Sequence, residues 1–266
     1  MSDSAPATFI ELLFLGTGTS AGVPMIGCHC PVCSSTDPRD KRMRPSVVIS
    51  YGSSRVLVDT TPELRLQAVA HRVDRIDALV FTHAHADHVM GLDDVRRFNS
   101  TKGGPLDVYA EAQTFSDLNR CFAYAFKPHD PSDGLFRPNL IRHSITGAFE
   151  IANTRWTPVP LIHGGERVLG FRVGHLAYCT DVSEIPESSF DLLHDLDYLI
   201  LGALHHKPHP KHFSLDQAMD AARRTGAKQT LFTHISHAIA HAPTNASLPP
   251  NMQLAYDGQR ITARAD

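Results

Sequence analysis

The sequence predicts one α/β domain over residues 1–266, built from two mixed sheets with helices outside them. Short apolar, β-branched runs recur along the chain and are typical of strands, and amphipathic segments of helical period lie between or after them. No linker rich in Gly, Ser or Pro divides the chain, and 266 residues are within the range that one large α/β domain reaches.

Nine runs are candidate strands because each is short, apolar and rich in branched residues. They are 9–16, 46–51, 55–60, 77–83, 157–163, 168–173, 175–181, 197–203 and 229–234. Between the second and third runs, Gly52, Ser53 and Ser54 supply turn chemistry, which predicts a hairpin.

The clearest helix is 215–225. Ser214 and Gln217 have the spacing of a capping box before it, and Gly226 closes its end. Further helices are expected at 62–72, where Pro62 takes a first-turn position, at 111–124 and at 184–194.

Composition narrows the classes of function that this protein can have. A net charge of −3 gives no general attraction to nucleic acid or anionic lipid, and the best local basic cluster, Lys41, Arg42 and Arg44, is typical of a solvated loop. No apolar run approaches the roughly 18 residues of a membrane helix, and the first residues lack the basic region of a signal peptide. We therefore expect a cytoplasmic protein that acts on a small molecule, with no membrane partner. Histidine, at 17 of 266 residues, directs attention to metal or acid–base chemistry.

A cluster of ionisable residues lies in FTHAHADHVMG (81–91), directly behind an apolar run: His83, His85, Asp87 and His88. Such groups repel one another when protonated and are costly to desolvate, so a cation is expected among them. Neutral imidazoles and a carboxylate are ligands that zinc, manganese and iron accept. An exposed polar loop is the alternative, but it leaves the position at a strand end unexplained.

Three further runs end in a side chain that can ligate a metal: His163, Asp181 and His234. Each alone is unremarkable. Because rigid elements hold site geometry better than loops do, we expect these residues to complete two sites together with the first cluster.

HAHADH followed by His163, Asp181 and His234 resembles the metallo-β-lactamase superfamily, whose members are αββα sandwich hydrolases. The resemblance runs from 12 to 257 and implies that fold here. It also implies the ligand assignment: the first metal takes His83, His85 and His163, the second takes Asp87, His88 and His234, and Asp181 bridges both. Asp59 matches the family's aspartate that supports a ligand histidine, with a strand-end turn residue as the alternative.

A second motif is C-x-C-x-x-C, formed by Cys28, Cys30 and Cys33, which are too close in sequence for a set of structural disulfides. Zinc would deprotonate all three and accept a fourth ligand, for which His237 is the candidate. A redox pair of Cys30 and Cys33 is the alternative, but it lacks the helix N-terminus that usually activates a thiol. The remaining cysteines, Cys121 and Cys179, are expected in the core.

The glycines of GTGTSAG miss the dinucleotide-binding spacing, and Pro24 follows where that motif requires a helix. We therefore reject a Rossmann loop. The backbone N–H groups of this turn could instead face a phosphate.

GTGTSAGVP, CHCPVC, HAHADH, THISH and YDG together resemble the branch of the superfamily that contains phosphoribosyl 1,2-cyclic phosphate phosphodiesterase, an enzyme of phosphonate breakdown with a separate Cys3His zinc site. The resemblance implies a phosphoric diester hydrolase for a small, cyclic phosphodiester, with two zinc, manganese or iron ions and one structural zinc. His212 matches a histidine near the substrate and is the candidate acid, with a helix N-terminal surface residue as the alternative. The stretch GGERVLG after His163 and the loop 127–138 depart from the branch and leave the substrate open.

The predicted catalytic residues are Asp87, Asp181 and His212, of which Asp181 holds both ions and His212 protonates the leaving alkoxide. Three other functions stay open. A transfer-RNA 3′ processing nuclease needs a basic arm that the sequence does not show, a thioester hydrolase or lactamase fits the same ligands, and a metal-dependent binding module would need no bridging aspartate. Homodimer formation, common in the family, also stays open.

Overall fold

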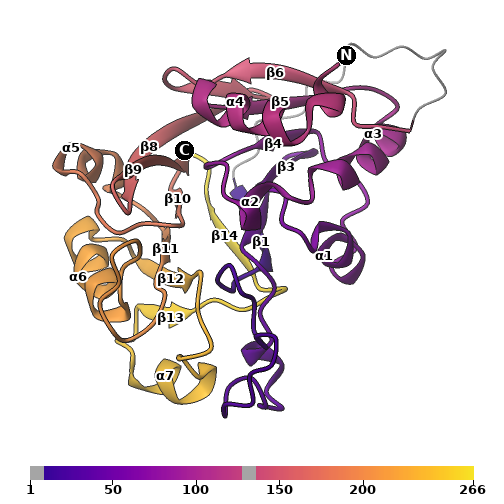
Figure 1. Cartoon of the computed structure of the whole chain (residues 1–266). Helices are drawn as coiled ribbons and strands as arrows, with labels where there is room; N and C mark the ends of the chain where they lie inside the picture. The colour runs from indigo at the N-terminus through magenta and orange to yellow at the C-terminus, as the bar shows by residue number, and fades with distance from the viewer. Residues whose placement is uncertain (1–8, 128–135) are drawn as a thin grey trace.

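The structure, a computed structural model, describes residues 9–127 and 136–266. Figure 1 shows two groups of strands with helices beside each: the indigo-to-magenta half of the chain forms most of one, joined by the yellow C-terminal strand, and the second half of the chain forms the other. Each group is a seven-stranded mixed sheet. The predicted αββα sandwich, with two mixed sheets, is confirmed.

The first sheet has the strand order β14-β1-β2-β3-β4-β5-β6. It is formed by β1 (Phe9–Gly16), β2 (Ser46–Tyr51), β3 (Ser54–Val58), β4 (Ala78–Val80), β5 (Leu106–Ala110), β6 (Leu140–Ser144) and β14 (Arg260–Arg264). Neighbours from β14 to β3 are antiparallel, and neighbours from β3 to β6 are parallel. The carboxyl ends of β3 and β4 therefore meet at the same edge of the sheet.

The second sheet has the order β13-β12-β11-β10-β9-β8-β7. It is formed by β7 (Phe149–Ile151), β8 (Thr154–His163), β9 (Glu166–Val173), β10 (Leu176–Cys179), β11 (Tyr198–Gly202), β12 (Gln229–Thr233) and β13 (Met252–Leu254). Neighbours from β7 to β10 are antiparallel and those from β10 to β13 are parallel. Here too the ends of parallel strands, β10, β11 and β12, gather at one edge.

Three apolar layers hold the sandwich together. Side chains of both sheets, such as Phe14, Trp156 and Phe171, form the layer between them. The outer face of the first sheet packs under α1 (Leu64–Ala70), α3 (Arg96–Lys102) and α4 (Ala112–Cys121), and that of the second sheet packs under α5 (Glu187–Phe190) and α6 (Leu215–Thr225). Alternation along the strands explains this: successive side chains enter the central layer and an outer layer in turn.

All nine predicted strands are present, with ends shifted by at most three residues. The hairpin is also present: Tyr51 pairs with Ser54, so Gly52 and Ser53 form the turn, and Gly52 takes a positive φ of 54°. The sequence reading missed β5, β6, β7, β13 and β14. These strands are short or carry polar residues at alternate positions, so no apolar run marks them.

The helix α6 has the predicted bounds, and its capping box between Ser214 and Gln217 is formed in both directions. The helix expected at 62–72 is shorter, since Glu63 is its N-cap and Pro62 lies outside it. The helix expected at 184–194 is a single turn, α5, followed by a 3-10 turn. Of the predicted loop 127–138, residues 128–135 lie outside the described residues.

A long excursion between β1 and β2, residues 17–45, crosses to the other half of the molecule. In Figure 1 it is the indigo segment near α7 (His241–Ser247). The buried Arg42 holds it there: its guanidinium pairs with Asp40 at 3.1 Å and donates to the carbonyl of Ser236. Within the described part of the chain, no helix combines the length and the apolar character needed to span a bilayer.

Candidate metal centre

Strand ends from both sheets deliver the candidate ligands to one place. Asp59 directly follows β3, and HAHADH follows β4. The second sheet contributes His163 at the end of β8, Asp181 after β10 and His234 after β12. Two groups of ligand atoms result, each within 4.8 Å of one another: His83, His85, His163 and Asp181 in one, and Asp87, His88, Asp181 and His234 in the other. The structure therefore brings together all seven residues that the sequence singled out.

The second group has the spacing of a metal site. Asp181 Oδ1 lies 3.3 Å from His88 Nε2 and 3.1 Å from His234 Nε2. Asp87 Oδ2 lies 3.5 Å from His88 Nε2 and 3.6 Å from His234 Nε2. A tetrahedral ion with bonds of about 2.1 Å holds its ligand atoms about 3.4 Å apart, so these separations fit an ion between the four side chains.

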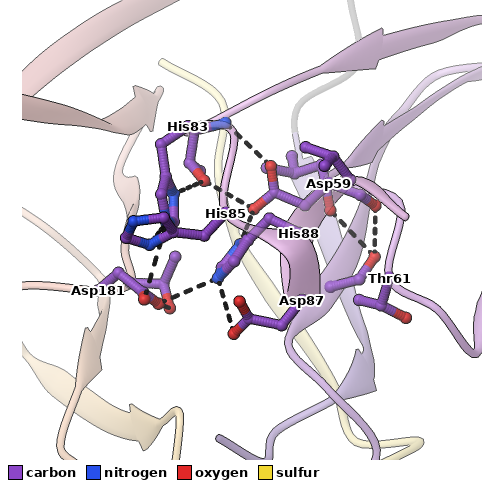
Figure 2. A network of polar contacts seen from close by, with 12 residues as sticks. Asp59, Thr61, His83, His85, Asp87, His88 and Asp181 are labelled. Atoms are coloured by element: carbon purple, nitrogen blue, oxygen red, sulfur yellow. Dashed lines mark hydrogen bonds and ion pairs between the residues drawn. The ribbon is translucent and has the colours of Figure 1, made fainter. Parts of the chain in front are cut away.

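The first group uses the other oxygen of the shared aspartate. Asp181 Oδ2 lies 3.9 Å from His83 Nε2 and 3.7 Å from His163 Nε2. His85 Nδ1 lies 2.9 Å from His83 Nε2. Because one oxygen of Asp181 faces each group, its carboxylate is placed to bridge two ions; Figure 2 shows it between the imidazoles and His88.

Most of the ligand imidazoles have an orienting partner on their other nitrogen. His88 Nδ1 donates to Asp59 Oδ2 at 2.7 Å, and His163 Nδ1 donates to the backbone carbonyl of Lys211 at 2.7 Å. His83 Nδ1 lies 3.0 Å from the hydroxyl of Thr82, which itself donates to Asp59. Such partners fix the tautomer and the ring orientation of a metal-binding histidine. Asp59 takes the supporting position that the family resemblance implies, as Figure 2 shows.

Three residues of the site also have a strained backbone conformation. Asp59, Asp181 and His234 have positive φ values of 63°, 49° and 58°, a region that residues other than glycine rarely adopt. Each lies just past a strand end, where the left-handed conformation turns its side chain toward the centre. Strained conformations of this kind cost about 1–3 kcal/mol each and persist where the surrounding structure determines them.

Electrostatics keep both carboxylates and His83 in their metal-binding states. Burial alone would raise the pKa of Asp181, but the charges of His234 and His88 outweigh it and hold that pKa well below its usual range. Burial likewise opposes ionisation of Asp87, while the close approach of His234 and His88 to its carboxylate lowers its pKa. Burial and the neighbouring His88 lower the pKa of His83. Ionised carboxylates and a neutral imidazole are the forms that bind metal ions.

The buried nitrogens also fit a cation. Among the described residues, neither His88 Nε2 nor His234 Nε2 has a hydrogen-bond partner, although both are buried. Burial lowers the pKa of His88, but Asp181 and Asp59 raise it well above its ordinary value, so these carboxylates stabilise positive charge at this point. Buried polar atoms without partners are rare in folded proteins. The residues present therefore fit a pair of divalent ions.

The cysteine motif forms a separate cluster. Cys28, Cys30 and Cys33 place their sulfur atoms 3.2, 3.4 and 3.6 Å from Nδ1 of His237, near the roughly 3.5 Å expected between sulfur and nitrogen ligands of tetrahedral zinc. The backbone N–H of Cys33 donates to the sulfur of Cys30 and lowers the pKa of that thiol to about 6. The four residues predicted for a zinc site are therefore together.

His212 lies against the ligands. Its ring centroid is 4.6 Å from that of His163 and 4.6 Å from that of His234, on which it stacks at 20°. The sequence thus predicted a side chain that does lie at the centre, beside one ligand from each group.

Two expectations are wrong. The amides of Gly18, Thr19 and Gly22 are not free to bind a phosphate, because Gly18 donates to the carbonyl of Met43, Thr19 to that of Ile235 and Gly22 to that of Thr19. Cys121 is exposed at the end of α4 rather than buried, since it falls on the polar side of that helix; Cys179 is buried as predicted.

Several residues that contact the metal ligands were not predicted from the sequence. Glu166, at the start of β9, places its carboxylate 3.7 Å from His85 Nε2 and so faces the free nitrogen of that ligand. The carbonyl of Lys211 and the hydroxyl of Thr82 orient other ligands. A backbone carbonyl has no sequence signature, whereas Thr82 could have been found from its position between the strand and His83.

Comparisons with known proteins agree with this geometry. A family model described as a beta-lactamase superfamily domain matches residues 54–235. The fold and the two ligand groups agree with this match, and the chain belongs to the metallo-β-lactamase superfamily. Within it, the chain belongs to the PhnP family: the crystal structure of a new diphosphatase from that family is 44% identical, with a TM-score of 0.90, and the match covers 97% of this chain and 98% of that one.

Two other relatives are more distant. Zn²⁺-bound PqqB from Methylobacterium extorquens has a TM-score of 0.78 at 17% identity, over 94% of this chain and 99% of that one, which shows the shared fold alone. An octanoyltransferase of Porphyromonas gingivalis is 35% identical over 255 residues, which are 94% of this chain and 51% of that protein. The chain spans about half the length of the curated relatives it matches.

Proposed function

We propose that the chain is a dinuclear-metal phosphodiesterase that hydrolyses a small, cyclic phosphodiester such as phosphoribosyl 1,2-cyclic phosphate. The observation that carries this proposal is the position of Asp181, whose two carboxylate oxygens each face one group of ligands. When bound, two divalent ions would activate water near neutral pH and neutralise charge on the phosphoryl oxygens. Zinc, manganese and iron all accept this mixture of nitrogen and oxygen ligands.

The chain's own residues perform the other tasks. Asp87 and Asp181 supply the negative charge that keeps two cations close together. Asp59 and the carbonyl of Lys211 hold ligand imidazoles in one orientation, so the site needs little reorganisation during the reaction. His212 lies beside a ligand from each group; because burial and His234 lower its pKa to about 3, its imidazole would give a proton to the departing alkoxide only when the bound phosphate stabilises its protonated form.

A second candidate is hydrolysis of a diphosphate, because the 44% identical PhnP-family structure is described as a diphosphatase. Both reactions displace an oxygen from phosphorus and would use the same residues. They differ in the leaving group, which is an alkoxide in one case and a phosphate in the other. A phosphate leaves without a proton from the protein, so loss of His212 should harm cyclic diester hydrolysis more than diphosphate hydrolysis.

The experiment is metal analysis per chain together with a hydrolysis panel. The panel contains a ribose 1,2-cyclic phosphate, a nucleoside diphosphate sugar, bis(p-nitrophenyl) phosphate, a thioester, a β-lactam and a precursor transfer RNA. Three metals per chain with selective cleavage of the cyclic phosphate support the proposal. Turnover of only the thioester, the lactam or the RNA would assign another hydrolase function, and turnover of none would favour a binding module.

A further inference from the structure

The imidazole of His85 differs from the other ligand imidazoles in its exposure. Its side chain is 36% exposed. The side chains of the other four are 8% exposed or less: His83, His88, His163 and His234. Packing therefore constrains those four rings more tightly than the ring of His85. A metal-binding histidine whose ring is not held by packing depends on a partner at its other nitrogen to keep its orientation.

One nitrogen of His85 is available for such a partner. Its Nδ1 lies 2.9 Å from His83 Nε2, among the ligand atoms of the first group, so Nδ1 is the atom that would bind the ion. The proton of a neutral imidazole then lies on Nε2, which makes Nε2 a hydrogen-bond donor. The carboxylate of Glu166 lies 3.7 Å from this nitrogen.

A tight hairpin turn fixes the position of Glu166. Strands β8 and β9 are joined by two residues, Gly164 and Gly165, whose φ values are 60° and 87°. Positive φ at both central positions is the requirement of a type I′ turn, which matches the twist of antiparallel strands. The N–H of Gly164 also donates to the hydroxyl of Ser183 at 3.0 Å. The turn sets the register, in which Glu166 pairs with the ligand His163.

This register directs the Glu166 side chain toward the metal centre. Residues directly opposite each other on antiparallel strands place their side chains on the same face, so Glu166 shares the face of His163. The next residue, Arg167, faces the other way and pairs with Glu111 at 3.1 Å. Glu166 and Arg167 thus contact residues that follow β4 and β5 of the first sheet.

The two ligand groups also differ in their negative charge. The second group contains two carboxylates, Asp87 and Asp181, and Asp59 lies behind its His88. The first group contains only the shared Asp181. Glu166 supplies a further negative charge beside a ligand of the first group, where it favours a bound cation.

We infer that Glu166 is a positioning residue of the first metal group: its carboxylate accepts from His85 Nε2–H and so keeps Nδ1 directed at the ion. The separation of 3.7 Å needs a movement of less than about 1 Å by an exposed carboxylate to reach the roughly 2.7–3.2 Å of a hydrogen bond. The inference rests on the proposed function, because it requires an ion in the first group. Loss of Glu166 should weaken that ion's binding about tenfold, the lower end for such partners, because water screens an exposed contact.

The test is titration of the metal-free protein with Co²⁺, followed by absorption spectroscopy. The Cys3His step carries sulfur-to-metal charge-transfer absorption, and the step of the first group is the one that disappears in His85→Ala. Glu166→Ala should weaken that step about tenfold and leave the other two within about twofold. Glu166→Gln keeps an oxygen that accepts from His85 Nε2–H but lacks the charge, so its loss should be about threefold. Glu150→Ala, an exposed glutamate on the edge strand β7, is the matched control and should change no step.

The outcomes separate the inference from the proposed function. Equal Co²⁺ affinity of the first group in the wild type and in Glu166→Ala refutes the inference. An equal loss in Glu166→Ala and Glu166→Gln, or a loss at all three steps, also refutes it, because the first shows an effect of charge alone and the second a role in the fold. A wild type that binds no Co²⁺ in the first group contradicts the proposed function instead. In that case the ring ¹⁵N chemical shifts of His85 in the metal-free protein decide the inference: the proton must lie on Nε2 in the wild type and shift toward Nδ1 in Glu166→Ala.

Discussion

The Oδ2 atom of Asp59 lies 2.7 Å from Nδ1 of His88, and both side chains are completely buried. The carboxylate also accepts from the backbone N–H and the hydroxyl of Thr82. Asp59, which directly follows β3, thus orients two residues: His88, a ligand of the second group, and Thr82, which precedes the ligand His83. Its hydrogen bonds connect the strand ends of β3 and β4.

This relationship predicts the effect of Asp59→Asn. Asparagine tolerates the positive φ at this position, so the fold should persist, but an amide stabilises the His88 imidazole less than a carboxylate does. We expect metal affinity at the second group to fall about 10- to 100-fold. Titration of the apoprotein with zinc, followed by metal analysis, measures it. Asp74→Asn, on the surface, is the control; equal zinc affinity in both variants would show that Asp59 does not support the ligand.

Replacement of the shared carboxylate tests the mechanism directly. Asp181→Ala removes one ligand from each group and leaves imidazoles with little opposing charge. Hydrolysis should fall about 10³-fold or more, the equivalent of roughly 4 kcal/mol of transition-state stabilisation. His83→Ala should have a similar effect because it removes a ligand of the first group. Near wild-type turnover by a metal-free Asp181→Ala protein would refute the two-ion mechanism.

Much of this centre could be predicted because its ligands stand at the ends of apolar runs, and strands end where such runs end. The contacts that orient these ligands could not be predicted from the sequence. The carbonyl of Lys211 and the carboxylate of Glu166 reach the ligands from segments that only the sandwich brings near, and neither has a local pattern. The same holds for the glycine turn: its amides bond to Met43 and Ile235, whose proximity depends on the tertiary fold.

The edges of the sheets show the limit of hydrophobic patterns. Strand β6, with Ile141 45% exposed, and β14, with the alternating sequence RITAR, are edge strands in the first sheet. Edge strands bury one face or less, so they keep polar residues and lack a continuous apolar run. The strands with a neighbour on each side were all recognised except β5, whose sequence LDVYA alternates in burial and has no continuous apolar run.

The cysteine cluster predicts a structural role that is separable from catalysis. Few apolar side chains surround it, with Val23 and Val32 the buried ones beside Cys33, so a bound zinc would supply much of the order of this loop. Cys30→Ser should remove one zinc per chain and lower Tm by about 5 °C or more. The exposed Cys121→Ser is the matched control and should change neither. A Cys30→Ser protein with full zinc content would contradict the Cys3His assignment.

The pH dependence of stability should report on Asp257. This carboxyl is half-buried, and burial raises its pKa to about 7, against the hydrogen bonds that it accepts from the backbone N–H of Met43 and the hydroxyl of Thr17. The folded chain therefore keeps this proton to higher pH than the unfolded chain, whose aspartates titrate near about 3.9. Protonated Asp257 therefore stabilises the folded state fully below pH of about 3.9. This stabilisation, about 2–4 kcal/mol in total, is lost as pH rises through about 7.

Asp257→Asn removes this titration and keeps one oxygen that can accept from the backbone N–H of Met43, while its NH2 group faces the Thr17 hydroxyl, which can accept as well as donate. Urea unfolding at pH 5 and at pH 8 gives the change in the free energy of unfolding for each protein, and their difference isolates Asp257 because all other groups are shared. The wild type should lose more stability than Asp257→Asn between the two pH values, while the exposed Asp216→Asn should behave like the wild type. An equal loss in all three proteins would mean that the Met43 and Thr17 hydrogen bonds keep the Asp257 carboxylate ionised at both pH values, and the predicted dependence would be wrong.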